Sequence, residues 1–250
     1  MHRFFVPPSA IQGDTVAFAR EQARQLARVL RARPGQRVVV LDDSGLERLV
    51  RLTVVGPREA LGKVEETVSG RGEPSLRLVL YMAVLKGDRF ELVLQKGTEL
   101  GVAAFVPVLF ARSVSRPDAM AWARGRRGRW ERILREAAEQ SGRSRLPRLG
   151  EPMTLEEAAS AARGLRLAPW EGEGSRSLRS LLEGLDGPPG EVSLLVGPEG
   201  GFEPWEVEVV RSRGFHTVGL GPRILRAETA AIVSTALVMH HGGQMEGGPG

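Results

Sequence analysis

Hydrophobic positions in the first 68 residues come in short runs that alternate with polar positions, as in half-buried β-strands. Residues 42–45 separate two such runs and predict a hairpin turn. A helical spacing of apolar residues after Asp14 predicts a helix over residues 14–30. We therefore expect a small, mostly β unit, with strands at residues 3–6, 37–41, 47–55 and 63–68.

Beyond a polar linker at residues 69–74, the pattern changes to continuous apolar runs separated by helical periodicity. Such runs are typical of strands buried on both faces, so this part is expected to be α/β with a mainly parallel sheet. The strands are expected at residues 76–85, 102–110, 165–168, 192–196 and 216–219. The helices are expected at residues 90–100, 130–140, 155–162, 177–185, 204–213 and 227–240. The resulting domains are 1–70 and 75–242, followed by a flexible, glycine-rich tail at 243–250.

Composition narrows the classes of protein and site. The chain has no cysteine and four histidines, and no spacing of histidines and acids indicates a zinc site, so we expect neither disulfides nor a metal. No apolar run is long enough to span a bilayer, and the first residues lack the pattern of a secretory signal. We therefore expect a soluble, cytoplasmic protein.

The net charge of +5 is unevenly distributed. Residues 124–148 hold nine arginines and three glutamates. This surplus is consistent with a phosphate-binding face, and equally with a solvated helix surface in an arginine-rich protein.

Two loops are candidates for chemistry. The first, at residues 197–201, follows the apolar run 192–196 and contains three glycines, which permit close approach of a ligand to the backbone. It lies at the carboxyl end of a predicted strand, where open α/β sheets bind ligands. Taken alone, it is better explained as a tight strand-to-helix connection.

The second loop runs from residue 220 into the last predicted helix. Each residue has an ordinary alternative role: Glu228 can interact with the helix dipole, Thr229 can cap the helix, and Ile224 and Leu225 can pack in the core.

The two loops together carry a resemblance. LLVGPEGGF (194–202) followed about twenty residues later by LGPRILRAETA (220–230) resembles the SPOUT class of RNA methyltransferases. Within that class the chain is similar to the ribosomal small-subunit methyltransferase E (RsmE) family. Further matches occur in the same order: RVLRARPGQRV (28–38), LKGD (85–88), QKGTELGV (95–102) and EAAEQSGR (136–143).

The resemblance implies a SPOUT-type catalytic domain with a deep trefoil knot, an exception to the rule that chains avoid knots. It also implies an N-terminal PUA-like β-barrel that binds RNA, S-adenosylmethionine as the cofactor, and a homodimer. The implied reaction is methylation of uridine N3 in 16S ribosomal RNA, with the free RNA or the small ribosomal subunit as partner.

The same resemblance implies roles for individual residues. Arg226 is the first candidate for contacting the uracil oxygens, Arg223 the second, and Glu228 is a candidate base. Cofactor contacts are expected at Leu195, Val196, Gly197, Glu199, Gly200, Gly201, Leu220, Gly221, Ile224, Leu225 and Arg226. RNA contacts are expected at Arg3, Arg28, Arg31, Arg124, Arg126, Arg127, Gln140, Arg143 and Arg145.

Two other functions stay open at this point. One is a SPOUT methyltransferase acting on transfer RNA or large-subunit ribosomal RNA. The other is a non-catalytic RNA-binding factor for ribosome assembly. The role of Lys96 and Glu99 is also open. Their i,i+3 spacing fits an ion pair on an exposed helical face, and an active-site role is the alternative.

Overall fold

The computed structural model describes residues 1–70, 72–113 and 119–246, with only the backbone described for residues 119–124. The chain forms two compact units. Residues 1–73 and 135–146 make up the N-terminal unit, and residues 74–134 and 147–250 make up the second unit.

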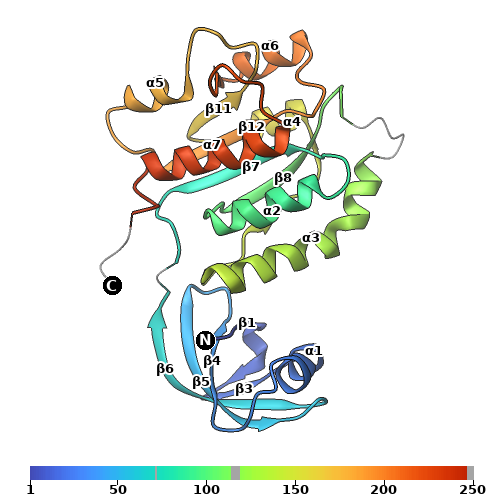
Figure 1. Cartoon of the computed structure of the whole chain (residues 1–250), viewed down its shortest axis with the longest axis vertical. Helices are drawn as coiled ribbons and strands as arrows, with labels where there is room; N and C mark the ends of the chain where they lie inside the picture. The colour runs from blue at the N-terminus through green and yellow to red at the C-terminus, as the bar shows by residue number, and fades with distance from the viewer. Residues whose placement is uncertain (71, 114–118, 247–250) are drawn as a thin grey trace. The chain divides into compact units, whose positions relative to one another are not determined.

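The N-terminal unit is built on a six-stranded sheet in the order β1-β4-β5-β6-β3-β2. Its strands are β1 (Arg3–Phe5), β2 (Ile11–Gln12), β3 (Thr15–Ala17), β4 (Arg37–Leu41), β5 (Leu46–Val55) and β6 (Ala60–Ser69). The pairing of β5 with β6 is interrupted twice by register shifts, which bend the long hairpin visible in Figure 1. Its core gathers apolar side chains such as Phe4, Val16 and Leu26.

The predicted helix over residues 14–30 is wrong in its first third. Thr15–Ala17 form β3, which pairs with β6, and Val16 is fully buried opposite Gly62. Helix α1 (Arg20–Arg24) begins only after this strand and continues as the π-helix η2 (Gln25–Val29). Burial of Val16 against a neighbouring strand outweighs the weak helical preference of the segment.

Residues 135–146 belong to the N-terminal unit, which corrects the expectation that residues 75–242 form one continuous domain. They include the end of helix α3 (Ala119–Ser141). Ala138 is buried with Phe5 and Leu41 in a small apolar cluster, and the Phe5 amide donates to the carboxylate of Glu139 at 2.9 Å. The sequence pattern gave no sign of this assignment, because the contacts join residues more than 90 positions apart.

The second unit is built on a seven-stranded parallel sheet in the order β10-β8-β7-β12-β11-β13, with β9 also paired to β8. The strands are β7 (Arg77–Ala83), β8 (Ala104–Leu109), β9 (Arg148–Leu149), β10 (Met153–Thr154), β11 (Leu165–Pro169), β12 (Glu191–Val196) and β13 (His216–Val218). The expected mainly parallel α/β architecture is confirmed.

The helices that follow these strands are α2 (Arg89–Glu99), α4 (Leu155–Ala161), α5 (Leu178–Glu183), α6 (Pro204–Ser212) and α7 (Ala227–His241). Helices α2 and α7 pack against each other beside the sheet (Figure 1). The core of this unit includes Leu80, Leu94, Leu194 and Met239.

Residues 243–246 do not continue as an unpaired tail. The amide of Ser75 donates to Gln244 Oε1 at 2.8 Å, and the amide of Gln244 donates to the Met239 carbonyl. The remaining residues of the predicted tail, 247–250, lie outside the described residues.

Candidate functional site

A cavity of about 340 Å³ lies where the 197–201 loop, after β12, faces the 220–226 loop, before α7. Both loops follow the carboxyl ends of strands that flank β11 in the sheet. Parallel strands bring such loops to one edge, which is why residues far apart in sequence meet here. The cavity walls include Gly197, Glu199 and Gly201 from the first loop and Ile224, Leu225 and Arg226 from the second.

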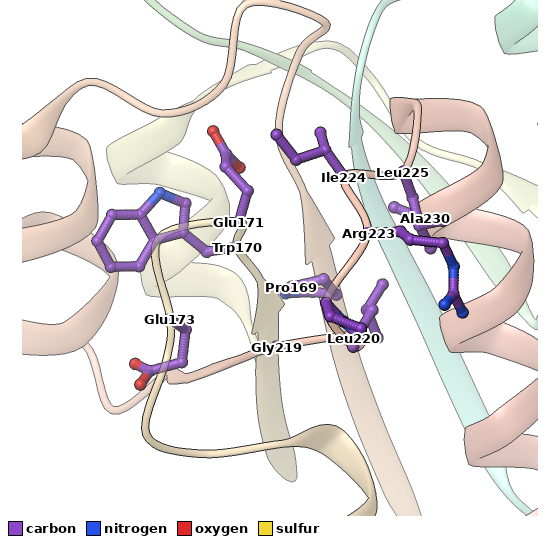
Figure 2. Close-up of a pocket in the computed structure, with 12 residues that line it drawn as sticks. Pro169, Trp170, Glu171, Glu173, Gly219, Leu220, Arg223, Ile224, Leu225 and Ala230 are labelled. Atoms are coloured by element: carbon purple, nitrogen blue, oxygen red, sulfur yellow. The ribbon is translucent and has the colours of Figure 1, made fainter.

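A smaller cavity of about 110 Å³ adjoins the first and shares Pro169, Glu171 and Ile224 with it. Figure 2 shows Trp170 and Glu171 on one side of this cavity and Leu225 on the other. Ile224 is 86% exposed although it lines both cavities. So large an exposed apolar side chain between two cavities is available to cover a bound ligand.

Glycine is required at two positions of the 197–201 loop. Gly201 has a φ of +71°, and a Cβ there would lie 2.4 Å from Glu171 Oε1. A Cβ at Gly197 would lie 2.8 Å from the ring of Phe202. The loop therefore owes its path to glycine, and both glycines line the larger cavity.

Hydrogen bonds and an ion pair that involve Glu203 and Glu206 help to fix the 197–201 loop. Glu206 is fully buried, and its carboxylate accepts from the amides of Ala111 at 2.7 Å and Glu203 at 2.8 Å. Arg112 donates to Glu203 at 2.7 Å and to the Gly200 carbonyl at 2.9 Å. The hydrogen bond to Glu203 raises the pKa of Arg112.

The loop after β11 is anchored by Glu173. Its carboxylate accepts from the Ser175 hydroxyl at 2.6 Å, the Thr217 hydroxyl at 2.6 Å and Arg211 Nη2 at 3.2 Å. The hydrogen bonds from Ser175 and Thr217 lower the pKa of Glu173 to about 2, because they favour the ionised form. Arg211 also lies over the Trp170 ring, so this anchor supports a wall of the smaller cavity.

Arg89, the first residue of α2, extends the site beyond the three loops. It lines the larger cavity, and its guanidinium lies beside Glu199 and Glu228. Glu228 itself is 8% exposed and lines neither cavity.

Most of the sequence-predicted cofactor residues are brought together at the two cavities. The residues that line them are Val196, Gly197, Glu199, Gly201, Leu220, Gly221, Ile224, Leu225 and Arg226. Leu195 is fully buried in β12, and Gly200 lines neither cavity. Of the catalytic candidates, Arg226 lines the larger cavity and Arg223 the smaller.

Arg89 and the loop that begins with Pro169, Trp170 and Glu171 were not among the site residues predicted from the sequence. The loop carries none of the motifs quoted above, but it follows a predicted parallel strand. The rule that ligands bind at the carboxyl ends of such strands could have identified it. Arg89 directly follows the quoted segment 85–88 and could have been found by extending it.

Several predicted RNA contacts are engaged in ion pairs. Arg3 pairs with Glu47 at 2.5 Å, Arg126 with Glu91 at 3.6 Å, and Arg127 with Glu131 and Glu151. These pairs favour the structural interpretation of the arginine-rich segment over a free phosphate-binding face.

At the end of that segment, Arg143 is 4% exposed and pairs with Glu73 at 2.9 Å, so we do not retain it as an RNA contact. Arg145 donates to the carbonyls of Asp43 and Ser44. Gln140 is exposed.

Arg28 and Arg31 are exposed near the end of the π-helix η2. The side chain of Arg124 lies outside the described residues.

Three further observations bear on the expected chemistry. Lys96 pairs with Glu99 at 2.9 Å as an i,i+3 ion pair on α2, which favours the structural interpretation of this pair. The described residues contain no group of three or more histidines and acids arranged to hold a metal ion. In the same part of the chain, no helix is both long and apolar enough to cross a bilayer.

Known proteins resemble this chain over almost its full length. The RNA methyltransferase domain family matches residues 72–239, and the RNA methyltransferase PUA domain family matches residues 18–65. The ribosomal RNA small subunit methyltransferase E of Synechocystis sp. is 35% identical over 95% of this chain and 77% of its own length. That of Bacillus subtilis is 30% identical over 96% of both chains.

A solved structure agrees with these relatives. The ribosomal RNA small subunit methyltransferase E of Neisseria gonorrhoeae, bound to S-adenosyl methionine, superposes with a TM-score of 0.86 at 31% identity, covering 96% of this chain and 97% of that one. The overall fold and the match to the PUA domain agree with these relatives. The chain therefore belongs to the ribosomal RNA small subunit methyltransferase E family.

Proposed function

We propose that this protein binds S-adenosylmethionine between the 197–201 and 220–226 loops and transfers its methyl group to uridine N3 in 16S ribosomal RNA. The observation that carries the proposal is the meeting of these two loops at one cavity of about 340 Å³. Pockets for small cofactors have volumes of roughly 300–1,000 Å³. The relatives named above are small-subunit ribosomal RNA methyltransferases by name, and one of them is solved with this cofactor.

The residues present fit this cofactor in kind. Gly197 and Gly201 line the cavity without a side chain that would fill it, and Ile224 and Leu225 supply apolar surface for an adenine ring. S-adenosylmethionine supplies a methyl group on a sulfonium, which is already electrophilic. The task of the protein is therefore to align donor and acceptor and to exclude competing water.

Uridine N3 carries a proton and becomes a good nucleophile only when that proton leaves. A cation near the uracil oxygens stabilises the charge that develops as it leaves. Arg226 lines the larger cavity and is our first candidate, with Arg223 second. Glu228 lines neither cavity, which argues against the direct role as a base that the sequence predicted for it.

The RNA is proposed to reach the N-terminal unit through exposed arginines, of which Arg28 and Arg31 are the clearest. Because N3 lies on the Watson–Crick edge, the target base must be unpaired or flipped out. A homodimer and the trefoil knot remain predictions. The exposed Leu237 on α7, a helix rich in small residues, is consistent with a subunit interface.

The test is transfer of tritium from labelled S-adenosylmethionine to small ribosomal subunits that lack the modification, followed by nucleoside analysis. We expect label in 3-methyluridine. We also expect Arg226→Ala to lower turnover by about 100-fold or more while changing RNA affinity less than about threefold. Label in a ribose methyl, in cytidine or only in another RNA would overturn the substrate assignment. Failure to bind the cofactor in calorimetry would favour a non-catalytic RNA-binding factor.

A further inference from the structure

Arg89 contacts both segments that form the larger cavity although it belongs to neither. Its Nη1 lies 3.3 Å from Glu199 Oε1, in the 197–201 loop. Its Nε lies 3.8 Å from Glu228 Oε1, in the first turn of α7. A single guanidinium therefore joins a carboxylate from each of the two motifs that the sequence singled out.

A second donor fixes the position of Glu199. The backbone amide of Lys86 donates to the same Oε1 atom at 3.1 Å. Gly87, with a φ of +63°, turns the chain between Lys86 and Arg89. The amide and the guanidinium thus converge on one oxygen, and a charge-assisted pair of this kind restricts the carboxylate more than a single donor would.

Because Glu228 is buried, the charge of its carboxylate needs the nearby Arg89 guanidinium more than the charge of an exposed acid would. It is 8% exposed, and its Oε2 is buried with no hydrogen-bond partner among the described residues. A buried carboxylate is unfavourable unless a cation or hydrogen-bond donors compensate its charge. Arg89 supplies a cation at 3.8 Å, and the N-terminus of α7 adds the positive end of a helix dipole.

The balance of charge argues against Arg89 as a binding site for another anion. Two carboxylates already surround its one positive charge, so a phosphate beside it would be repelled by both acids. What the arrangement does provide is a fixed separation between the 197–201 loop and the start of α7. The cavity lies between these two segments.

We propose that Arg89 is a positioning residue that holds Glu199 and Glu228, and with them the two walls of the cofactor cavity, in place. The inference rests on the proposed function, because the cavity it shapes is the one assigned to S-adenosylmethionine. An ordinary exposed ion pair would contribute little and would leave cofactor binding unchanged. The two interpretations therefore differ in a measurable quantity.

The experiment is calorimetric titration of the full chain with S-adenosylmethionine, for the wild type, Arg89→Gln, Glu228→Gln and the double variant. We expect each single change to weaken binding about tenfold. The double variant should bind within about twofold of Arg89→Gln, because two residues that act as one unit are not additive. In the tritium assay, KM for the cofactor should rise more than kcat falls.

Arg179→Gln is the matched control. Arg179 is an exposed arginine of α5 that pairs with Glu183 at 2.7 Å and lines neither cavity, so its loss should leave the cofactor Kd unchanged. Arg89→Lys provides a second arm if Arg89→Gln does not fold. One ammonium cannot span both carboxylates as the guanidinium does, so an intermediate loss is expected.

Wild-type cofactor affinity in Arg89→Gln or Arg89→Lys would overturn the inference. So would a double variant whose loss of affinity equals the product of the two single losses. If the wild-type chain itself fails to bind the cofactor, the proposed function fails and this inference fails with it. If the wild type binds the cofactor and Arg89→Gln binds it with the same affinity, this inference fails and the proposed function stands.

Discussion

Arg211 lies over the indole ring of Trp170, with its guanidinium carbon 5.4 Å from the ring centroid. The same guanidinium donates to Glu173 at 3.2 Å and to the Thr217 hydroxyl at 3.0 Å. The side chain from α6 therefore fixes the loop after β11, including the wall that Trp170 gives to the smaller cavity.

Replacing Arg211 by methionine should weaken cofactor binding by about two- to tenfold, since a cation–π contact and a charged hydrogen bond are lost together. The apolar stem is kept, so the core of α6 should be little affected. Arg213→Met, an exposed arginine two positions later, is the control. Equal cofactor affinity of the two variants in calorimetry would show that Trp170 needs no support from Arg211.

Glu173 should make the stability of the second unit depend on pH in the acid range. Its pKa is lowered to about 2, so the native state favours the ionised form. The stabilisation is complete above the ordinary pKa of 4.5 and is lost as pH falls towards 2. Thermal melting of the wild type and Glu173→Gln should differ most above about pH 5 and converge towards pH 2. A difference that grows as the pH falls would contradict this assignment.

Gly201→Ala should weaken cofactor binding and lower stability by about 1 kcal/mol, because alanine is strained at positive φ. The new Cβ would also displace Glu171, which lines both cavities. Gly187→Ala is the matched control, since a Cβ there meets no atom within 4 Å. Calorimetry should show weaker cofactor binding, and thermal melting a lower stability, for Gly201→Ala than for Gly187→Ala. Equal affinity and stability of the two variants would show that Gly201 has no special role.

Arg28→Gln and Arg31→Gln should weaken RNA binding and reduce its salt dependence. Each lost phosphate contact reduces the magnitude of the slope of log affinity against log salt by about 0.7 on a single-stranded nucleic acid. Filter binding of a 16S ribosomal RNA fragment at several salt concentrations measures the slope. Arg143→Gln provides the contrast. Loss of its buried ion pair with Glu73 should lower the free energy of unfolding by about 1–3 kcal/mol and leave the salt dependence of RNA binding unchanged. A reduced slope in that variant would instead restore Arg143 as an RNA contact.

The parts of the fold that follow from local periodicity could be predicted from the sequence. The strand Arg37–Leu41 has the predicted bounds, and helix α7 differs from its prediction by one residue. The helix expected from residue 14 was wrong because Val16 is buried by pairing with β6, a contact that no local pattern contains. Long-range contacts likewise placed residues 135–146 in the N-terminal unit.

The part of the candidate site that depends on glycine could be predicted from the sequence. Gly197 and Gly201 occupy positions where a Cβ would collide or where φ is positive, and such constraints are visible as motifs. Arg89 and Trp170 lie in segments that follow other strands of the sheet, β7 and β11, and the order of the parallel strands brings them to the site. Glu228 could be placed on the correct helix, but its side-chain direction depends on packing between α2 and α7.

A crystal structure of this protein with S-adenosylmethionine tests the proposed cofactor site most directly. We expect the cofactor in the larger cavity, between the 197–201 and 220–226 loops, with its adenine beside Ile224 and Leu225. Density for the cofactor at any other place, with this cavity empty, would contradict it.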